Sequence, residues 1–385
     1  MDDRYIFSSD TLRAYMELNL LQPKLDRSIS RCSDWGIGLG ASQAVRIRTR
    51  ECPKDPQLSL KAIPNIVLDC PGLRDDFYVN LLDWSARNII SIALDRSVYA
   101  YNYETHQSNF VLSTEGVQAG YISSVKSSPS GDQLIVGNSS GCLVLFDVKK
   151  NQQVRRLELP AAHRIAVLEW ASTSGEFNSH VFIAGDQTGK IHYYDVRPKK
   201  SQCLTQQCHD QEVCGLSMSL DGHTLASGGN DNKVTFSDIR TRKAIYELDD
   251  FGAAIRALSW CPGRTGLIAM GTGMADRRIL VWCSTSNTFL AGKTVDAQVT
   301  GIFWESDCHI VSIHGSEGNE IILSDYPSLQ SVCSVRAHDI RILQSAISPD
   351  RKYLATAAPD ECLKVWSLVS RKCSSGDYRA SRKIL

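Results

Sequence analysis

The chain has 385 residues with 42 basic and 42 acidic side chains, so its formal net charge is +0, and nothing in this balance favours nucleic acid or an anionic membrane as a partner. No apolar run approaches the roughly 18 residues of a membrane span. The amino-terminal residues MDDRYIFSSD lack the basic and apolar regions of a signal peptide. We therefore expect an intracellular protein.

The first segment, residues 1–62, is expected to be an extended, disordered tail. It contains one compact motif, Asp3-Arg4-Tyr5-Ile6. A charged pair followed by an aromatic and an aliphatic residue is a suitable anchor for a groove on a partner protein. A match of four residues is weak evidence for a docking motif when it stands alone. It becomes stronger only together with the features of the rest of the chain.

An internal repeat then covers residues 63–369. Successive strand-like segments align at spacings of 43, 43, 48, 42, 44 and 43 residues, at Trp84, Ser127, Trp170, Met218, Trp260, Trp304 and Ile347. A second register at the same period is mostly aromatic: Tyr101, Phe146, Tyr194, Ser237, Trp282, Ser324 and Trp366. Each unit alternates apolar and polar residues between Gly, Ser, Asn and Asp turns, as a β-meander does. The sequence therefore predicts an all-β, seven-bladed WD40 β-propeller.

The last unit carries a set of polar residues known as a structural network in WD repeats: His338, Thr356, Asp360 and Trp366. A buried aspartate needs such partners, because an unpaired charge there would be costly. His163 and His209 occupy equivalent places in earlier units. For these histidines we favour the structural role over a role as ligand or base. The last blade lacks a fourth strand after Val369, and Asn65–Asp69 is expected to supply it, tying the two ends of the propeller together.

Common motifs of catalysis or cofactor binding are absent from the sequence. The sequence has no nucleophile elbow, zinc-protease helix, phosphate-binding loop or dinucleotide fingerprint. Adjacent acids such as Asp75-Asp76 point to opposite faces of a strand and make no acid–base dyad. The one cluster that suggests a metal, Cys203, Cys208, His209 and Cys214, has spacings that match no common zinc pattern. We expect no enzyme activity, no cofactor and no metal.

Several stretches resemble the fizzy family of WD-repeat coactivators of the anaphase-promoting complex. They are IPNIVLDCPGLRDDFYVNLLDWS from Ile63, EVCGLSMSLDGHTLASGGNDN from Glu212, GTGMADRRILVW from Gly271 and SPDRKYLATAAPDECLKVW from Ser348. The resemblance covers all seven blades. It implies a protein of the cytoplasm and nucleus that binds degron peptides of substrates such as cyclins and presents them to this ubiquitin ligase in mitosis or meiosis. No nucleic acid and no membrane partner is implied.

The resemblance also implies two degron sites. Asp83 and Glu361 match acidic positions that face the arginine of a destruction box, and two carboxylates suit a guanidinium. Positions for a Lys-Glu-Asn degron are matched by Asn230, Asn232, Met274, Gln298 and Arg341. The structural alternative for the two asparagines is that they only form a turn. For Gln298 and Arg341 it is that they are only exposed residues at the start of a strand.

The ends of the chain carry the elements expected to dock on the ligase. Asp3, Arg4, Tyr5 and Ile6 resemble the family's C-box, but Phe7 and Ser9 replace its proline and arginine. The tail at 370–385 is expected to have little strand character and ends in Ile384 and Leu385, where the family commonly ends in Ile-Arg. Met274 replaces a polar residue, usually threonine, and removes a hydroxyl. These departures resemble divergent germline or meiotic branches such as insect cortex. They keep open an alternative function, a protein-interaction scaffold that has lost ligase activation.

Overall fold

The structure is a computed structural model that describes residues 60–114, 120–159, 162–171, 180–197, 203–316 and 318–368, with the backbone of 382–384. All of the regular elements in this part of the chain are β-strands. Among the same residues no helix is long and apolar enough to cross a membrane.

The strands form seven sheets, which we call blades, each with four antiparallel strands, and the seventh carries one further, parallel strand at its edge. Blade 1 contains β2 (Leu82–Trp84), β3 (Ile89–Leu94), β4 (Ser97–Asn102) and β5 (Gln107–Ser113). Blade 2 contains β6 (Ile122–Ser127), β7 (Gln133–Asn138), β8 (Cys142–Asp147) and β9 (Gln152–Glu158). Blade 3 contains β10 (Ile165–Trp170), β11 (Val181–Asp186), β12 (Lys190–Asp195) and β13 (Cys203–Gln207).

The later blades repeat this arrangement. Blade 4 contains β14 (Val213–Met218), β15 (Thr224–Gly229), β16 (Val234–Asp238) and β17 (Ala244–Leu248). Blade 5 contains β18 (Ile255–Trp260), β19 (Leu267–Thr272), β20 (Arg278–Cys283) and β21 (Thr288–Thr294). Blade 6 contains β22 (Val299–Trp304), β23 (His309–His314), β24 (Glu320–Asp325) and β25 (Ser331–Arg336). Blade 7 contains β26 (Gln344–Ile347), β27 (Tyr353–Ala358), β28 (Cys362–Ser367) and β1 (Ile66–Asp69), with β29 (Arg382–Ile384) at its outer edge.

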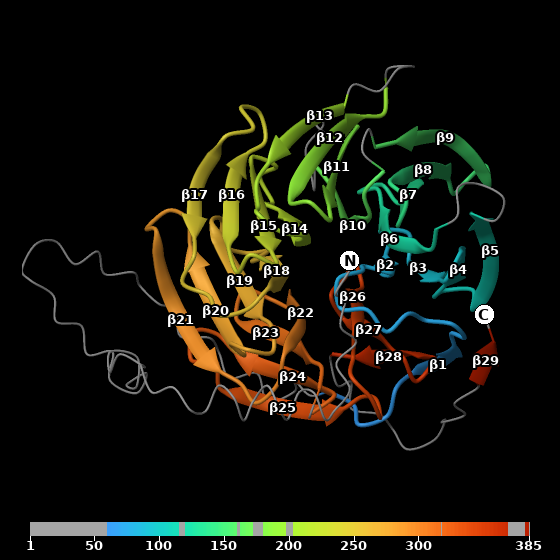
Figure 1. Ribbon diagram of the computed structural model, residues 1–385. Coiled ribbons are helices and arrows are strands. Elements are labelled where there is room, and N and C mark those ends of the chain that lie inside the picture. The colour runs from blue at the N-terminus through green and yellow to red at the C-terminus, as the bar shows by residue number, and fades with distance from the viewer. Residues whose placement is uncertain are drawn as a thin grey trace, which may run out of the picture. The chain divides into compact units, whose positions relative to one another are not determined.

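The blades stand radially around a common axis, with the first strand of each blade innermost (Figure 1). These inner strands line a central channel. The core lies between neighbouring blades, where the inner strands are mostly buried and the outer strands mostly exposed. All seven third-strand positions of the predicted aromatic register are buried, with exposures of 4% or less. The predicted seven-bladed propeller is confirmed.

Glycines allow the inner strands of neighbouring blades to approach closely. In blade 4, a Cβ at Gly228 would collide with the backbone of Ile255 in blade 5. In blade 5, a Cβ at Gly271 would collide with the side chain of Val299 in blade 6. The glycines in these strands therefore set the spacing between blades, since any side chain there would force the blades apart.

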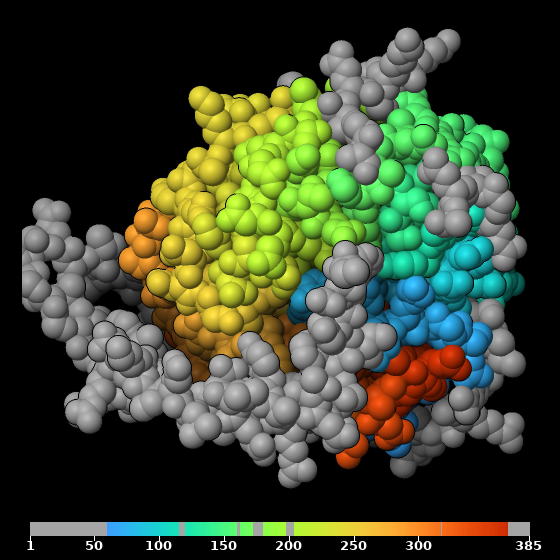
Figure 2. Space-filling view, viewed as in Figure 1, coloured from blue at the N-terminus to red at the C-terminus, as the bar shows by residue number. Residues whose placement is uncertain are grey.

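The ring is closed by the amino-terminal strand β1, as the sequence predicts. β1 pairs antiparallel with β28, in a register that joins Ile66 to Val365 and Asp69 to Cys362. The backbone N–H of Asn65 also donates to the carbonyl of Val365 at 2.7 Å. Figure 2 shows the blue start of the described chain lying against the red last blade. Opening the ring therefore requires breaking a ladder between residues nearly 300 positions apart in the chain.

The carboxyl-terminal end differs from the expectation of little strand character. The backbone of Arg382–Ile384 forms β29, which pairs parallel with the free edge of β1. An unpaired edge presents a row of N–H and C=O groups to any extended segment, and this segment of the tail satisfies part of that row.

The polar network predicted in blade 7 is present with all four members. His338 Nδ1 lies 2.8 Å from Asp360 Oδ2 and His338 Nε2 lies 2.9 Å from Thr356 Oγ1. Trp366 Nε1 donates to the same Thr356 oxygen at 2.9 Å. Burial opposes ionisation of Asp360, but the hydrogen bond to His338 and the charge interaction with it hold the pKa of Asp360 below its usual value.

Two earlier blades use variants of this network. In blade 4, His209 contacts Asp231 and Ser227 at 3.0 and 2.9 Å, as its position predicts. In blade 3, the aspartate Asp186 is bound at 2.9 Å by His192 of its own blade. His192 therefore takes the place that the repeat assigns to His163.

Removing the hydroxyl at the centre of the blade 7 network should destabilise the propeller. Thr356→Val keeps the side-chain shape but leaves His338 Nε2 without its hydrogen-bond partner and the Trp366 N–H without an acceptor. We expect the free energy of unfolding to fall by about 1–3 kcal/mol. Urea unfolding followed by tryptophan fluorescence measures it, with Thr356→Ser as the matched control that keeps the hydroxyl. Equal stability of the valine and serine variants would contradict the role of the network.

Candidate functional site

The five residues predicted to read a Lys-Glu-Asn degron lie at one end of the propeller. Asn230 and Asn232 are in the β15–β16 turn and Met274 is in the β19–β20 turn, while Gln298 and Arg341 precede the innermost strands β22 and β26. In a meander, the start of the first strand and the turn between the second and third lie at the same end. The backbone bond from Asn230 N to Glu212 O, at 2.8 Å, shows this directly, because Glu212 precedes the innermost strand β14. We call this end the entry face.

A segment that none of the predictions singled out crosses the entry face. Residues 75–81, which we call the lead segment, connect the closing strand β1 to the innermost strand β2. Asn80 bridges to Ser124 of blade 2, and its amide donates to the carbonyls of Ala166 in blade 3 and Cys214 in blade 4 at 3.0 and 3.4 Å. Gln344 of blade 7 binds both Val79 O and Leu81 N at 2.9 Å. The lead segment therefore ties blades 2, 3, 4 and 7 together at the mouth of the channel.

Blade 5 contributes a buried arginine to the same contacts. Arg256 on β18 donates to the carbonyls of Leu343 and Val79 at 2.7 and 2.8 Å and to Gln344 Oε1 at 3.0 Å. These acceptors are neutral, and burial lowers the pKa of Arg256 to about 10. The cost of burying this charge is offset by several hydrogen bonds and by the Phe77 ring, 5.4 Å from the guanidinium carbon. Arg256 therefore acts as a structural anchor for the lead segment.

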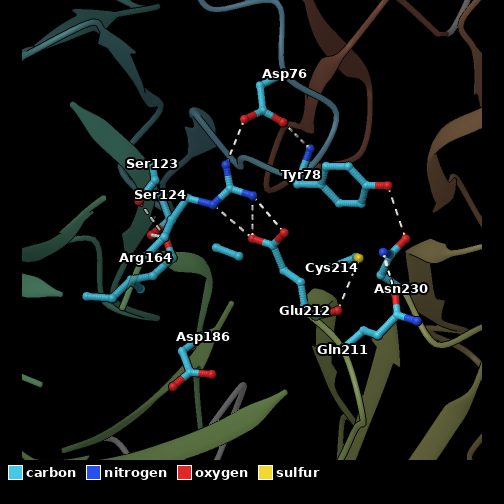
Figure 3. Close-up of polar contacts among 12 residues, drawn as sticks. Asp76, Tyr78, Ser123, Ser124, Arg164, Asp186, Gln211, Glu212, Cys214 and Asn230 are labelled. Carbon is cyan, nitrogen blue, oxygen red and sulfur yellow. Dashed lines mark hydrogen bonds and ion pairs between the residues drawn. The ribbon is translucent and has the colours of Figure 1, made fainter. Parts of the chain in front are cut away.

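A second buried arginine binds two carboxylates at the entry face (Figure 3). Arg164 donates to Glu212 through Nε at 2.9 Å and through an NH2 group 2.6 Å from both carboxylate oxygens. Its other NH2 group donates to Asp76 of the lead segment at 2.8 Å. Burial opposes the charge of Arg164, but the two carboxylates outweigh it and raise the pKa of Arg164 above its usual value. This set links the lead segment to blades 3 and 4 and fixes its path.

The lead segment also contacts two of the predicted degron-binding residues. The Tyr78 hydroxyl donates to Asn230 Oδ1 at 3.0 Å, and the Asn230 amide donates to Gln211 Oε1 at 2.8 Å (Figure 3). Burial raises the pKa of Tyr78 to about 12. On the opposite side, Arg341 donates to Asp75 Oδ1 through Nε at 2.7 Å. The structure therefore joins Asn230 and Arg341 through one segment.

The other three predicted residues are arranged around the same mouth without such links. Asn232 has φ 63°, so turn formation explains this asparagine at least in part. Met274 is partly buried in its turn. Gln298 is 8% exposed, and its backbone carbonyl accepts a hydrogen bond from Gly315 N at 3.0 Å. Beside it, His314 is buried with Nε2 2.8 Å from Ser312 Oγ, and burial lowers the pKa of His314 to about 4.

Below the lead segment, the channel encloses a cavity of about 350 Å³ lined by the inner strands of all seven blades. Asp83 lies in this lining, because Leu82 and Trp84 on β2 point into the core and the residue between them points the other way. Its carboxylate accepts from Ser127 N at 2.9 Å and lies 3.6 Å from Lys126 Nζ. Lys126 also binds Glu169 at 3.2 Å. Asp83 is thus part of a charge cluster inside the channel.

Glu361 lies elsewhere, in the β27–β28 turn with φ 58°. Its carbonyl accepts from Cys70 N at 2.7 Å and its Oε1 accepts from Gly72 N at 3.0 Å. The predicted pairing of Asp83 with Glu361 is therefore not observed. Asp69, the last residue of β1, stands opposite Cys362, the residue after Glu361, in the ladder, whereas Asp360 before Glu361 is bound by His338. Sequence reasoning missed Asp69 because it considered that residue only as part of the closing strand.

The remaining predicted residues are only partly covered by the structure. Asp3, Arg4, Tyr5, Ile6 and Leu385 lie outside the described residues, and Ile384 is described by its backbone in β29 alone. Within the described ranges no group of three or more His, Cys, Asp or Glu side chains is placed to hold a metal ion.

The lead segment could have been found by its charge pattern. The adjacent acids Asp75 and Asp76 cannot form a dyad. They do point apart, and each meets a different arginine, Arg341 and Arg164. Two adjacent acids between a closing strand and an innermost strand indicate contacts to two separate blades.

The fold agrees with comparisons to known proteins. Residues 68–366 match a family model described as the CDC20/Fizzy WD40 domain. A solved structure titled "Crystal Structure of Mitotic Checkpoint Complex" contains a similar chain, with a TM-score of 0.76, 36% identity, and coverage of 87% of this chain and 98% of that chain.

Three curated relatives are similar over most of this chain. WD repeat-containing protein slp1 of Schizosaccharomyces pombe is 39% identical over 85% of this chain and 67% of its own length. Cell division cycle 20.5, cofactor of APC complex, of Arabidopsis thaliana is 35% identical over 82% and 70%. Anaphase-promoting complex subunit cdc20 of Dictyostelium discoideum is 34% identical over 86% and 64%. The chain therefore spans about two thirds of the length of these relatives.

The buried His314 should make the propeller sensitive to mild acid. The unfolded imidazole binds a proton below about pH 6.5, whereas the folded one does so only near pH 4, so the free energy of unfolding falls as pH drops through this window. Between pH 7 and pH 5 we expect the wild type to lose about 2 kcal/mol more than His314→Gln. Urea unfolding at both pH values measures the difference. Parallel losses in the two proteins would rule out His314 as the cause.

Proposed function

This chain belongs to the CDC20/Fizzy family of WD40 proteins, and on that premise we propose that it is a substrate-recognising coactivator of the anaphase-promoting complex. In this role the propeller binds degron peptides of cell-cycle proteins such as cyclins and promotes their ubiquitination in mitosis or meiosis. Its site of action would be the cytoplasm and nucleus.

The relatives support the ligase as the partner. Two of them are named as a cofactor of the APC complex and as an anaphase-promoting complex subunit. In this chain, the proposed docking elements are Asp3-Arg4-Tyr5-Ile6 at one end and Ile384-Leu385 at the other. The first motif departs from the family pattern at the neighbouring residues Phe7 and Ser9, and the second departs from it at Leu385.

The observation that carries the proposal is the acidic pair at the closure of the ring. Glu361 and Asp69 come from the turn before β28 and the end of β1, which pair with each other. Two carboxylates at one end of a paired sheet suit the guanidinium of a destruction-box arginine. We therefore assign the degron arginine to Glu361 and Asp69 in place of Glu361 and Asp83, because the Asp83 carboxylate is bound inside the channel by Ser127 N and Lys126.

The entry face supports a second peptide site, for the Lys-Glu-Asn degron. Arg341 is 39% exposed and offers a cation for a glutamate. Asn230 offers an amide for a peptide asparagine, at a position fixed by Tyr78 and Gln211. Met274 contributes no hydrogen bond where the family usually has a hydroxyl, so we expect this site to bind more weakly than the acidic pair does.

The alternative of a scaffold without ligase activation rests on specific residues. Phe7, Met274 and Leu385 alter a docking motif, a binding position and a terminal anchor, while the propeller is intact. A scaffold of this kind would still bind peptides through the acidic pair, so peptide binding alone tests the site and leaves ligase activation to a separate assay.

Neutralising the acidic pair should weaken binding of a destruction-box peptide. For Asp69→Asn with Glu361→Gln we expect at least about a tenfold loss of affinity, because charge-assisted hydrogen bonds to the peptide arginine are lost. Fluorescence anisotropy with a labelled peptide measures it, and a peptide with alanine in place of that arginine should be insensitive to the double variant.

The matched control is Asp83→Asn, which removes one acid from the channel. Affinity equal to that of the wild type is expected for this variant. If Asp83→Asn weakens binding and the double variant does not, the arginine site is in the channel and our assignment is wrong.

A further inference from the structure

Arg341, the one guanidinium among the predicted degron-binding residues, is already bound to a carboxylate of its own chain. Its Nε and an NH2 group lie 2.7 and 2.6 Å from Asp75 Oδ1. These two groups form the edge of a guanidinium that carboxylates usually occupy in a bidentate pair. A peptide carboxylate that approaches this edge therefore meets Asp75 first.

The pair has the properties of a contact that can open. The side chains of Arg341 and Asp75 are 39% and 55% exposed. Exposed ion pairs of this kind contribute only about 0.2–1 kcal/mol, so the fold does not depend on this one. Within the described residues, Arg341 is the ion-pair partner of Asp75, and neither side chain is needed to close the ring or the channel.

The neighbouring residues keep Asp75 in place whether or not the pair is closed. Asp76 accepts from Tyr78 N at 2.8 Å and from Arg164 at 2.8 Å. Tyr78 in turn is held by Asn230 at 3.0 Å. Because its neighbours are anchored, the Asp75 carboxylate stays close to Arg341 and acts at a high effective concentration.

We propose that Asp75 is a built-in competitor for Arg341, which lowers the affinity of the entry face for peptide carboxylates. A glutamate-bearing peptide displaces Asp75 from the Nε edge of Arg341, and Asp75 then remains in water. A peptide that offers only the carboxylate gains little from this exchange. A peptide that also binds Asn230 and the groups around it gains enough binding free energy to offset the loss of the Arg341–Asp75 pair. Asp75 therefore makes the site selective for a complete motif.

This inference rests on the proposed function of the entry face. The experiment measures binding of a labelled Lys-Glu-Asn peptide, and of a matched Lys-Gln-Asn peptide, to the full-length wild type, Asp75→Ala, Arg341→Gln and the double variant. For Asp75→Ala we expect about two- to fivefold tighter binding of the glutamate peptide. This gain should shrink at high salt and should be absent with the glutamine peptide and in the Arg341→Gln background.

Asp339→Ala is the matched control for the change in net charge. Asp339 is exposed and lies two residues before Arg341, and it contacts Asn319 through its backbone carbonyl. We expect no gain from this variant. A gain as large as that of Asp75→Ala would reduce the effect to general electrostatics and overturn the proposal.

The remaining outcomes separate the inference from the function on which it rests. If the wild type binds the glutamate peptide and Asp75→Ala binds it equally or more weakly, Asp75 is neutral or positions Arg341, and the competitor role is wrong. If neither protein binds the peptide, the Lys-Glu-Asn site itself is wrong and the inference is overturned with it.

Discussion

The pairing of β1 with β28 is the constraint on which the rest of this structure depends. It makes the first described strand the fourth strand of the last blade, while the next strand, β2, is the innermost strand of the first blade. The residues between them must therefore cross from the outer rim to the channel. This crossing builds both candidate sites, because the acidic pair lies where β1 ends and the lead segment lies where β2 begins.

The crossing is stabilised by two buried arginines, and the free-energy cost of burying each charge is offset in a different way. Arg164 is compensated by the carboxylates of Glu212 and Asp76, whereas Arg256 is compensated by carbonyl and amide oxygens and an aromatic ring. Both arginines bring the lead segment into contact with blades far from it in sequence. The entry face is thus a rigid platform on which exposed groups such as Arg341 can exchange partners without a change of fold.

Much of this arrangement could be predicted from the sequence. The period of the repeat, the buried third-strand register, the network of His338, and the closing strand all follow from local patterns, and the structure confirms them. The pairing of Asp83 with Glu361 could not be judged from sequence, because the direction of a single side chain depends on which face of β2 packs into the core. The contacts of Asp76 and Asp75 could not be predicted either, because their partners lie 88 and 266 residues away in the sequence.

We propose that the propeller binds degrons and presents them to the ligase. The most direct measurement is ubiquitination of a cyclin by the purified anaphase-promoting complex and a ubiquitin-conjugating enzyme, with and without this protein. The account predicts stimulation that is lost when the degron of the cyclin is mutated or residues 2–7 of this protein are deleted. An intact protein that binds the degron peptide yet gives no stimulation would contradict the account and identify the chain as a scaffold.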